Sequence, residues 1–465
     1  MAEELFQKRI PVIPRSVSGR FRTLKTSILI LAYGVYYLLP WLRWERQSGP
    51  EQAVLFDIVA RKFYLFDLVV YAQDIFWLAG LLVIAAFVLF FVTSIAGRVF
   101  CGYFCFQTLW TDVFVFIERL VQGERNARIK LINAPPSFEK TFKLALTRLL
   151  WFVVALITGL SFTLYWGDAP ELLMQMLQGD APFPAYATTL FLTVTTFVMA
   201  GMAREQVCTY MCPYSRFQGV MYDQDTLIVA YDEERGEGKN GRWKPIKGLL
   251  KREDRQAKGY GDCIDCGYCV QACPVGIDIR NGMQYQCISC ALCIDACNTI
   301  MDSIKYPRGL IRYSSDQQLH GRHWSWVKWK NLGYSLAILL VTGLLIWSIT
   351  TRVLSEFRVQ QIRQPLYVTL SDGTIQNRYE LKLTNKHDTT QRYGIGLRGL
   401  PDAVLDVGHF EEIELKAGES VQLQVRVKLM PDTRPEKIRH FNFVLLNQRE
   451  DPKLAIRQKA QFYLP

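Results

Sequence analysis

Residues 263–297 contain the cysteine spacing C-x2-C-x2-C-x3-C twice in succession. This spacing places three thiolates in one loop, where they can hold three corners of a cubane iron–sulfur cluster. The fourth cysteine lies too far along the chain for the same cluster, and in two-cluster ferredoxins it ligates the other one. The sequence therefore predicts two [4Fe–4S] centres. The ligands of the first are Cys263, Cys266, Cys269 and Cys297, and those of the second are Cys287, Cys290, Cys293 and Cys273.

The alternative for this stretch is a pair of structural zinc sites. Zinc sites usually combine a C-x2–4-C pair with a second, distant pair of ligands, whereas each run here is a triplet plus one further cysteine. Pro274 follows the first run, as ferredoxins have it, and Asn298 stands at the corresponding position of the second run, which removes no ligand. The spacing therefore favours iron–sulfur clusters over zinc.

The other four of the twelve cysteines form two C-x3-C pairs, Cys101/Cys105 and Cys208/Cys212. Each pair follows an apolar run and has an arginine shortly before it, so the two segments look like an internal repeat. On a helix, residues i and i+4 share one face, so four thiols converge if the two apolar runs are neighbours. Such thiols suit Cu(I), zinc or another iron–sulfur cluster. They could also cycle between dithiol and disulfide, or simply fill space between helices.

Five apolar runs reach, or nearly reach, the length of about 20 residues that a membrane-spanning helix requires. These runs are Thr26–Leu42, Ile75–Ala96, Leu149–Trp166, Ala185–Ala203 and Leu332–Ile349. Residues 109–147 begin instead with an amphipathic pattern, which predicts a helix that lies on the membrane surface. The chain is therefore expected to be a membrane protein with about five spans.

The loops between these runs differ in charge, and this predicts their sides of the membrane. The net charge is +11, but the basic residues flank apolar runs and form no single patch, which favours a membrane protein over nucleic-acid binding. Residues 1–23, 98–148 and 204–330 are basic, whereas the loop 167–184 has no Lys or Arg. Five spans with a cytoplasmic N-terminus then place every cysteine on the reducing cytoplasmic side and residues 352–465 in the periplasm.

Residues 357–465 change character and alternate between apolar and polar side chains. The alternation is clearest at Tyr379-Leu381-Leu383, Tyr393-Ile395-Leu397 and Val421-Leu423-Val425-Val427. Turn signals such as Asp372-Gly373 separate these stretches. About 100 residues of short strands indicate an immunoglobulin-like β-sandwich, and no catalytic constellation is visible in it.

The predicted fold class is a multi-domain membrane protein. An α-helical transmembrane bundle of about five spans carries a two-cluster ferredoxin-like insertion and a C-terminal Ig-like β-sandwich. The expected domains are 1–222, the transmembrane region with four spans and both C-x3-C motifs; 223–330, the cytoplasmic ferredoxin-like domain; 331–352, the fifth span; and 357–465, the periplasmic β-sandwich. None of the five histidines lies in a predicted span, which argues against a membrane haem with two axial histidines. Neither a P-loop nor a dinucleotide-binding glycine motif after a strand stands out.

Three stretches taken together resemble one known family. They are Cys208-Thr209-Tyr210-Met211-Cys212-Pro213-Tyr214, Asp225-Thr226-Leu227-Ile228-Val229-Ala230-Tyr231-Asp232 and the double cysteine run. The chain resembles the FixG/RdxA/CcoG family of membrane polyferredoxins, called cytochrome c oxidase accessory proteins, over nearly its whole length. The double run alone is shared by many ferredoxins, and its union with the C-x3-C segments is more specific. The family's first motif continues Cys-Pro, whereas Phe106 follows Cys105 here, which bears on the local geometry of that pair.

This resemblance implies an oxidoreductase of the bacterial inner membrane that reduces Cu(II) to Cu(I) for the assembly of cbb3-type cytochrome c oxidase. The candidate copper-holding and catalytic residues are then Cys101, Cys105, Cys208 and Cys212. The implied partners are the membrane, a cytoplasmic electron donor, a copper transporter or chaperone and the oxidase subunits, with no nucleic acid among them. Two alternatives remain: a non-catalytic assembly scaffold, and a quinol-linked electron-transfer subunit like those of nitrate or nitrous oxide respiration.

Overall fold

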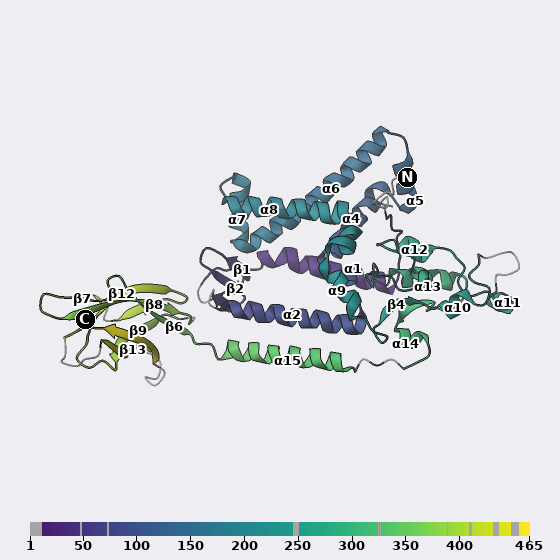
Figure 1. Ribbon diagram of the computed structural model, residues 1–465. Helices are drawn as coiled ribbons and strands as arrows, with labels where there is room; N and C mark the ends of the chain where they lie inside the picture. The colour runs from purple at the N-terminus through teal and green to yellow at the C-terminus, as the bar shows by residue number, and fades with distance from the viewer. Residues whose placement is uncertain are drawn as a thin grey trace, which may run out of the picture. The chain divides into compact units, whose positions relative to one another are not determined.

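The computed structural model describes residues 12–46, 49–71, 74–244, 251–323, 325, 327–387, 389–408, 412–430, 437–447 and 455–465. The chain forms two compact units (Figure 1). The first comprises Met1–Trp44 and Gln52–Leu345, and the second comprises Glu45–Glu51 and Ile346–Pro465. The first unit holds the cysteines and most of the long helices, and the second holds a β-sandwich.

Six helices in the described part of the chain are long and apolar enough to cross a membrane. Five of them coincide with the predicted runs. They are α1 (Arg20–Leu38) with the 3-10 turn η1 (Leu39–Trp41), α2 (Ile75–Ala96), α6 (Phe138–Thr163) with η3 (Leu164–Trp166), α8 (Phe183–Thr196) with the π-helical η4 (Phe197–Ala203), and α15 (Trp329–Thr350). The 22 residues of α2 extend about 33 Å at the helical rise, which matches a hydrocarbon core of about 30 Å.

The sixth candidate, Val99–Gln122, exceeds the predicted number of spans. It consists of α3 (Val99–Tyr103) and α4 (Phe106–Gln122), and α5 (Arg125–Asn133) follows it. The amphipathic pattern predicts a helix on the membrane surface, but the apolar face of α4 packs against the bundle. Phe114, fully buried, stacks on Trp151 of α6 with 5.4 Å between the ring centroids.

Two acidic side chains of α4 lie inside the protein, Glu118 buried and Asp112 largely so, and both are paired with arginines. Asp112 contacts Arg22 of α1 at 2.9 Å. Glu118 pairs with Arg128 of α5 and with Arg204, which follows η4. A buried carboxylate is costly unless it is paired and hydrogen-bonded, so these partners allow α4 to lie inside the protein. All three arginines are distant from α4 in sequence or on another helix, and a periodicity analysis of α4 alone cannot find them.

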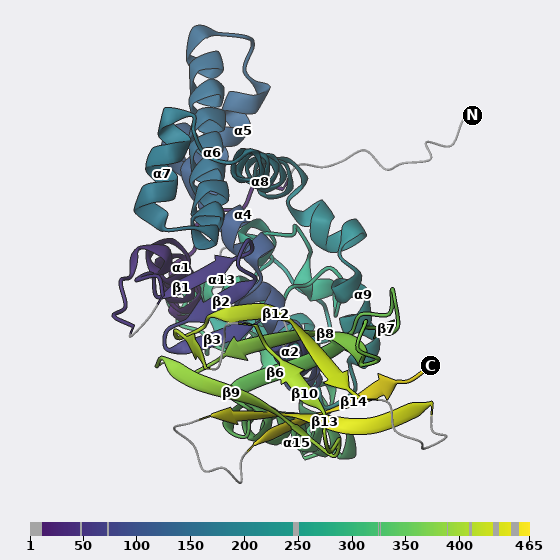
Figure 2. The same ribbon diagram turned by 90° about the vertical axis from the view of Figure 1, so that its left-hand side faces the viewer.

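Helices α6 and α8 lie side by side (Figure 2). Gly159 permits the close approach, because a Cβ atom there would lie 2.6 Å from the carbonyl oxygen of Thr189. The hydroxyl groups of Thr163 and Thr189 share a hydrogen bond of 2.8 Å at the same contact. Small residues and hydrogen bonds between helices are typical of packed membrane helices, where burial of apolar surface gives little driving force.

Short elements fill two connections at one end of the bundle. The segment between α1 and α2 is an antiparallel three-stranded meander, and the loop after η3 carries one helix. These elements are β1 (Val54–Asp57), β2 (Lys62–Leu65), β3 (Leu68–Tyr71) and α7 (Ala169–Gln178). Asp168 caps α7 by accepting a hydrogen bond from the amide of Glu171, and it also pairs with Arg43. The acidic loop 167–184 is thus held to the end of α1.

The cysteine-rich segment lies between two paired strands. Strand β4 (Ile228–Tyr231) is antiparallel to β5 (Ile311–Ser314), with Ile228 opposite Ser314. Short helices surround this pair: η5 (Val207–Met211), α9 (Pro213–Met221), α10 (Glu233–Glu237), α11 (Arg252–Ala257), α12 (Tyr268–Ala272), η6 (Ile279–Asn281), α13 (Leu292–Ser303) and α14 (Asp316–Leu319). The strand pair closes the ends of the segment onto each other.

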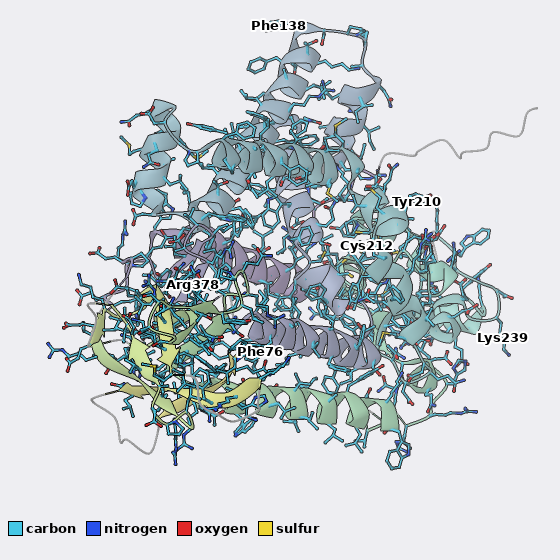
Figure 3. All side chains as sticks on the ribbon, turned by 60° about the vertical axis from the view of Figure 1, so that its left-hand side comes forward. Phe76, Phe138, Tyr210, Cys212, Lys239 and Arg378 are labelled. Atoms are coloured by element: carbon cyan, nitrogen blue, oxygen red, sulfur yellow. The ribbon has the colours of Figure 1, made fainter. Side chains whose placement is uncertain are left out.

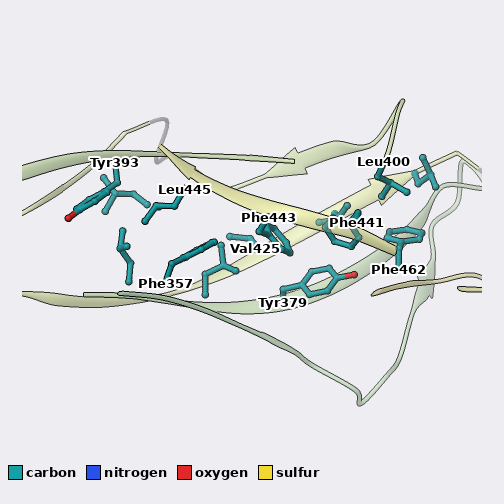
Figure 4. Packing of buried hydrophobic residues seen from close by; sticks show 14 of the residues in the cluster. Phe357, Tyr379, Tyr393, Leu400, Val425, Phe441, Phe443, Leu445 and Phe462 are labelled. Atoms are coloured by element: carbon teal, nitrogen blue, oxygen red, sulfur yellow. The ribbon is translucent and has the colours of Figure 1, made fainter. Parts of the chain in front are cut away.

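The second unit contains the predicted β-sandwich. One sheet has the strand order β10-β12-β8-β6 with β7 joined to β8, and the other has the order β11-β9-β13-β14. The strands are β6 (Ser355–Gln361), β7 (Val368–Thr369), β8 (Ile375–Asn385), β9 (Gln391–Arg398), β10 (Val404–Asp406), β11 (Ile413–Leu415), β12 (Ser420–Leu429), β13 (Ile438–Asn447) and β14 (Ile456–Tyr463). Tyr379 packs between Phe441 and Phe443 in the core (Figure 4).

Replacing Phe443 by alanine is expected to destabilise the sandwich by about 3–5 kcal/mol, because Phe443 is fully buried and the variant leaves a cavity. Ile438 on the same strand is 43% exposed, and Ile438→Ala is the matched control. The free energy of unfolding should be measured by pulse proteolysis of the whole chain in urea. Equal effects of the two substitutions would contradict the assignment of this core.

Candidate iron–sulfur and thiol sites

The first group of cysteines surrounds one cavity next to α12 and α13. It encloses about 350 Å³ of space free of protein atoms. Its cysteines are Cys263, Cys266, Cys269 and Cys297, the set that the spacing assigns to the first centre. The Cys297 thiol interacts electrostatically with those of the other three, so the fourth member of the set comes from α13, after the second run. Cys266 is the exposed member, so this site lies near the protein surface.

The second group surrounds a separate cavity, also of about 350 Å³. Cys273, Cys287, Cys290 and Cys293 all line it, which is the set assigned to the second centre. The Cys293 thiol interacts with those of Cys290, Cys287 and Cys273. The structure therefore brings each triplet together with the fourth cysteine of the other run.

The loops of the two runs have the same unusual backbone. Asp265 and Ser289, each just before the second cysteine of a run, have φ angles of 49° and 51°. Gly267 and Ala291, just after that cysteine, have φ angles of 67° and 59°. Left-handed residues that alternate with ordinary ones turn the amide groups inward and create a concavity suited to an anion, as at many iron–sulfur sites. The two sites are therefore built alike.

The chemistry of the thiols fits metal clusters. Burial raises the pKa of Cys269 and of Cys297 to about 12, so both thiols stay protonated near neutral pH unless a metal displaces the proton. Within the ranges that the structure describes, no three His, Cys, Asp or Glu side chains come close enough together for a single metal ion. This finding covers all twelve cysteines alike, so the spacing of the two runs is what favours iron–sulfur clusters over zinc.

The C-x3-C motifs are not continuous helices, which corrects the expectation that each pair shares one helix face. Helix α3 ends at Tyr103, and Cys105 is extended (φ −64°, ψ 125°) immediately before α4. Cys212 is likewise extended (φ −80°, ψ 112°) immediately before α9. Phe106 begins α4 just as Pro213 begins α9, so the second cysteine of each motif has similar backbone angles although no proline follows Cys105.

The four thiols of these motifs nevertheless lie together. Cys101 interacts electrostatically with Cys105, Cys208 and Cys212, and Cys208 also interacts with Cys105 and Cys212. The Cys101 thiol donates a hydrogen bond of 3.3 Å to the side-chain oxygen of Gln218 on α9. Cys212, labelled in Figure 3, joins this group from the end of η5. The repeat thus places one pair of cysteines opposite the other.

The thiol group borders the second cysteine cavity. Cys101 belongs to the same apolar cluster as Cys290 and Ile288. A Cβ atom on Gly102 would lie 2.7 Å from the carbonyl oxygen of Ile288, so only glycine allows α3 to approach this loop so closely. The Tyr103 hydroxyl donates a hydrogen bond of 3.1 Å to the carbonyl oxygen of Cys290. The second site therefore lies between the first site and the thiols.

A larger cavity of about 640 Å³ reaches Cys208. It is lined by residues of α1, of α4 and of the loop after the first cysteine run, among them Lys25, Asp112, Arg119 and Leu292. Most of the lining surface is apolar, but a buried carboxylate oxygen of Asp112 and the Nε of Arg119 have no hydrogen-bond partner. Of the four thiols, that of Cys208 lines this cavity.

Sequence reasoning missed several polar residues around these sites. Tyr103 and Gln218 contact the cysteines described above, and Lys25 of α1 interacts electrostatically with Cys290. Arg98 was noticed only as an arginine before the first C-x3-C motif, and the structure places it beside Cys101, Cys208 and Cys287. In the sequence, the recurrence of arginine before both C-x3-C motifs is the feature that indicates a role for Arg98 near the cysteines.

Comparison with known proteins agrees with this architecture. The family model for a 4Fe-4S dicluster domain matches residues 203–316, and the model described as the IG-like fold at the C-terminal of FixG matches residues 345–465. A crystal structure of a FixG-related protein from Vibrio parahaemolyticus aligns with 24% of this chain and 97% of its own, at 22% identity and a TM-score of 0.22.

Three characterised sequences align with most of the chain. Proteins RdxB and RdxA of Cereibacter sphaeroides are 44% and 43% identical, over 87% and 86% of this chain and 86% and 84% of their own lengths. The nitrogen fixation protein FixG of Rhizobium meliloti is 36% identical over 99% of this chain and 94% of its own. These identities over nearly full lengths show that the chain belongs to the FixG/RdxA family of membrane iron–sulfur proteins.

Proposed function

We propose that this protein passes electrons from two [4Fe–4S] centres to copper, reducing Cu(II) to Cu(I) for the assembly of cbb3-type cytochrome c oxidase. The observation that carries the proposal is the packing of Cys101, one of the four thiols of the C-x3-C motifs, against Cys290 of the second cysteine loop. In this proposal Cys263, Cys266, Cys269 and Cys297 hold one centre, and Cys273, Cys287, Cys290 and Cys293 hold the other. When bound, the two centres supply one-electron transfer.

The order of the sites gives electron transfer a direction. Cys266 is exposed, so the first site is the one that a cytoplasmic electron donor can approach. Cys290 is buried and packs against Cys101, so the second site is the one that faces the thiols. Tyr103 and Gly102 fix the distance between the second site and the thiols through their contacts with the second cysteine loop.

The thiol group has the chemistry of a site for copper as a substrate. Thiolates are soft ligands that prefer Cu(I), so coordination by Cys101, Cys105, Cys208 and Cys212 itself favours the reduced ion. The cavity that reaches Cys208 offers copper a path to this group. Copper is therefore expected to accept its electron where all four thiols converge.

The proposed membrane topology has five crossings, with the cysteines in the cytoplasm and residues 352–465 in the periplasm. Helices α3 and α4 are then re-entrant, because the start contacts the cysteine-rich region and the end contacts the N-terminal segment that is bonded to the same region. Tyr103 near the start donates to a carbonyl of the second run. Arg125, just after the end of α4, donates a hydrogen bond of 2.9 Å to the carbonyl oxygen of Ile13. The backbone amide of Arg15, two residues after Ile13, donates one of 2.8 Å to the carbonyl oxygen of Gln271, next to the first cysteine run. The basic loops fit the same arrangement.

Reporter fusions should test this topology. A periplasmic reporter such as alkaline phosphatase is expected to be active after Pro465 and inactive after Pro136, which follows α5. A cytoplasmic reporter should give the opposite pattern. If the phosphatase is active after Pro136, helices α3 and α4 cross the membrane and the re-entrant arrangement is wrong.

A second candidate function is quinol oxidation, which the large cavity favours. Its apolar lining suits a ring, and the unpartnered oxygen of Asp112 could accept a hydrogen bond from a hydroxyl group. In this alternative a quinol bound in the cavity supplies electrons to the second site, and the four thiols hold no copper. Oxidation of a short-chain quinol by the pure protein, without copper reduction, would favour this alternative.

The proposed function is tested by copper reduction with anaerobically purified protein. The protein should be reduced with dithionite, freed of excess reductant and mixed with Cu(II), and Cu(I) should be detected with a selective chelator. Cu(I) should form in step with reoxidation of the protein. Protein that carries iron and sulfide but forms no Cu(I) would refute copper reduction and leave the scaffold and quinol alternatives.

A further inference from the structure

Arg98 is a buried arginine at the junction of α2 and α3. It is 2% exposed, and its guanidinium donates hydrogen bonds to the carbonyl oxygens of Tyr285 and Ser215. It also lies over the Tyr285 ring, 5.9 Å from the ring centroid. These contacts connect α3 to the second cysteine run and to α9. They satisfy hydrogen bonds, but carbonyl groups carry no net charge with which to neutralise the arginine.

No carboxylate within the described ranges lies at ion-pair distance from Arg98. A buried cation without a counter-charge is strongly disfavoured, so its presence calls for a negative partner. Arg204, the arginine before the other C-x3-C motif, has such a partner in Glu118. Lys25, the other cation near Cys290, has Asp112 at 3.7 Å. Arg98 differs from both.

The groups that face Arg98 are thiols of the second cysteine site and of the C-x3-C motifs. It interacts electrostatically with Cys287 of the second run and with Cys101 and Cys208 of the C-x3-C motifs. These thiols become negative only when they bind metal. Arg98 therefore lies between the second cysteine site and the C-x3-C thiols. The negative charge of both depends on the metals that the proposed function assigns to them.

The first site has a buried cation of its own, Arg255, which is 2% exposed and donates a hydrogen bond of 3.2 Å to the carbonyl oxygen of Cys263. Arg280 is the arginine near Cys269, and it forms ion pairs with Asp278 at 2.7 Å and with Asp265. Its charge is largely cancelled by these carboxylates. Each site thus has a buried arginine that bonds carbonyl groups, Arg255 at the first and Arg98 at the second, and Arg98 also faces the thiols of the C-x3-C motifs.

We infer that Arg98 is a positioning residue for electron transfer, which rests on the proposed function for the metals at both sites. Its buried charge stabilises the reduced form of the centre held by Cys287, raises the reduction potential of that centre, and balances the copper-bearing thiolates. An electron that reaches the second centre is thereby stabilised there, beside the thiols.

The test is a redox titration of the whole protein in detergent, followed by electron paramagnetic resonance, with iron and sulfide measured on the same samples. Arg98→Gln removes the charge and keeps a hydrogen-bonding side chain. We expect one of the two midpoint potentials to fall by about 59 mV or more, a tenfold loss in the one-electron reduction equilibrium, while the other stays unchanged. Arg98→Lys keeps the charge and should restore most of the potential.

Arg204→Gln is the matched control, because Arg204 holds the equivalent place in the repeat but already has Glu118 as its partner. It should leave both potentials unchanged. Full iron content with unchanged potentials in Arg98→Gln would overturn the inference. If that variant loses iron, Arg98→Lys decides: a potential that falls although the charge is kept would show a purely structural role. Wild-type protein without iron–sulfur signals would instead refute the proposed function.

Discussion

Replacing Cys266 and Cys290 by alanine together is expected to remove most of the iron and at least nine-tenths of copper reduction, to about a tenth of wild type or below. Each substitution takes one ligand from one proposed centre, and a cubane held by three thiolates is readily lost. The wild type should contain about eight iron atoms per chain, which two cubanes require. Iron, acid-labile sulfide, visible absorption and Cu(I) formation should be measured on anaerobic preparations of both proteins.

Met283 provides the control for this experiment. It lies between the two cysteine runs and is 58% exposed, so Met283→Ala should retain both iron and copper reduction. If the double cysteine variant kept its iron and absorption, Cys266 and Cys290 would not be ligands, and the grouping of the eight cysteines would be wrong. Zinc in place of iron in the wild type would refute the assignment of iron–sulfur centres to these cysteines.

Replacing Cys208 and Cys212 by alanine should produce the opposite combination. Iron should stay near the wild-type content, because every proposed cubane ligand is kept, while Cu(I) formation falls at least tenfold for each intact cluster. Both side chains are partly buried and alanine is small, so folding should survive. Metal content and the rate of Cu(I) formation, each referred to protein with intact clusters, are the required measurements.

Tyr210 lies between these two cysteines and is 70% exposed, which makes Tyr210→Ala the matched control. It should change neither iron content nor copper reduction. An unchanged rate in the cysteine variant would mean that its thiols only fill space and that copper receives electrons elsewhere. Loss of about half the iron would mean that Cys208 or Cys212 ligates a cubane.

The parts of the fold that could be predicted from sequence are those whose signal is local. Helix α2 is a continuous apolar run of the right length, and the structure has it with the predicted bounds. In the sandwich, the alternating stretches of β8 and β12 turn out to be cross-strand partners: Tyr379 pairs with Val425 and Leu381 with Leu423. Periodicity therefore identified both strands, and the fold then paired them through the same apolar faces.

The parts that could not be predicted depend on contacts between distant residues. Asp112 and Glu118 make α4 look like a surface helix, because Arg22 and Arg204, which neutralise them, are 90 and 86 positions away. The sequence does not predict the helix break before Cys105 for a different reason. Proline is common at the first position of a helix, so Pro213 indicates that α9 begins there, whereas Phe106 gives no such indication for α4.

The candidate sites show the same division. The cysteine groups could be predicted because metal-ligand spacing is a local pattern. Arg98 and Tyr103 could not be assigned, because their partners are the second cysteine loop and α9, more than a hundred residues further along the chain. Spacing therefore predicts the ligands, and only the folded chain reveals which residues lie between the sites.

The most direct test of the central claim is a single mixing experiment. Anaerobic protein with both centres reduced is mixed with Cu(II), and the recovery of iron–sulfur absorption is followed together with Cu(I) formation. The account predicts about two Cu(I) ions per chain, formed at the rate at which the absorption recovers, since each centre stores one electron. Centres that stay reduced in the presence of Cu(II), or Cu(I) that forms as fast when Cys208 and Cys212 are alanine, would contradict it.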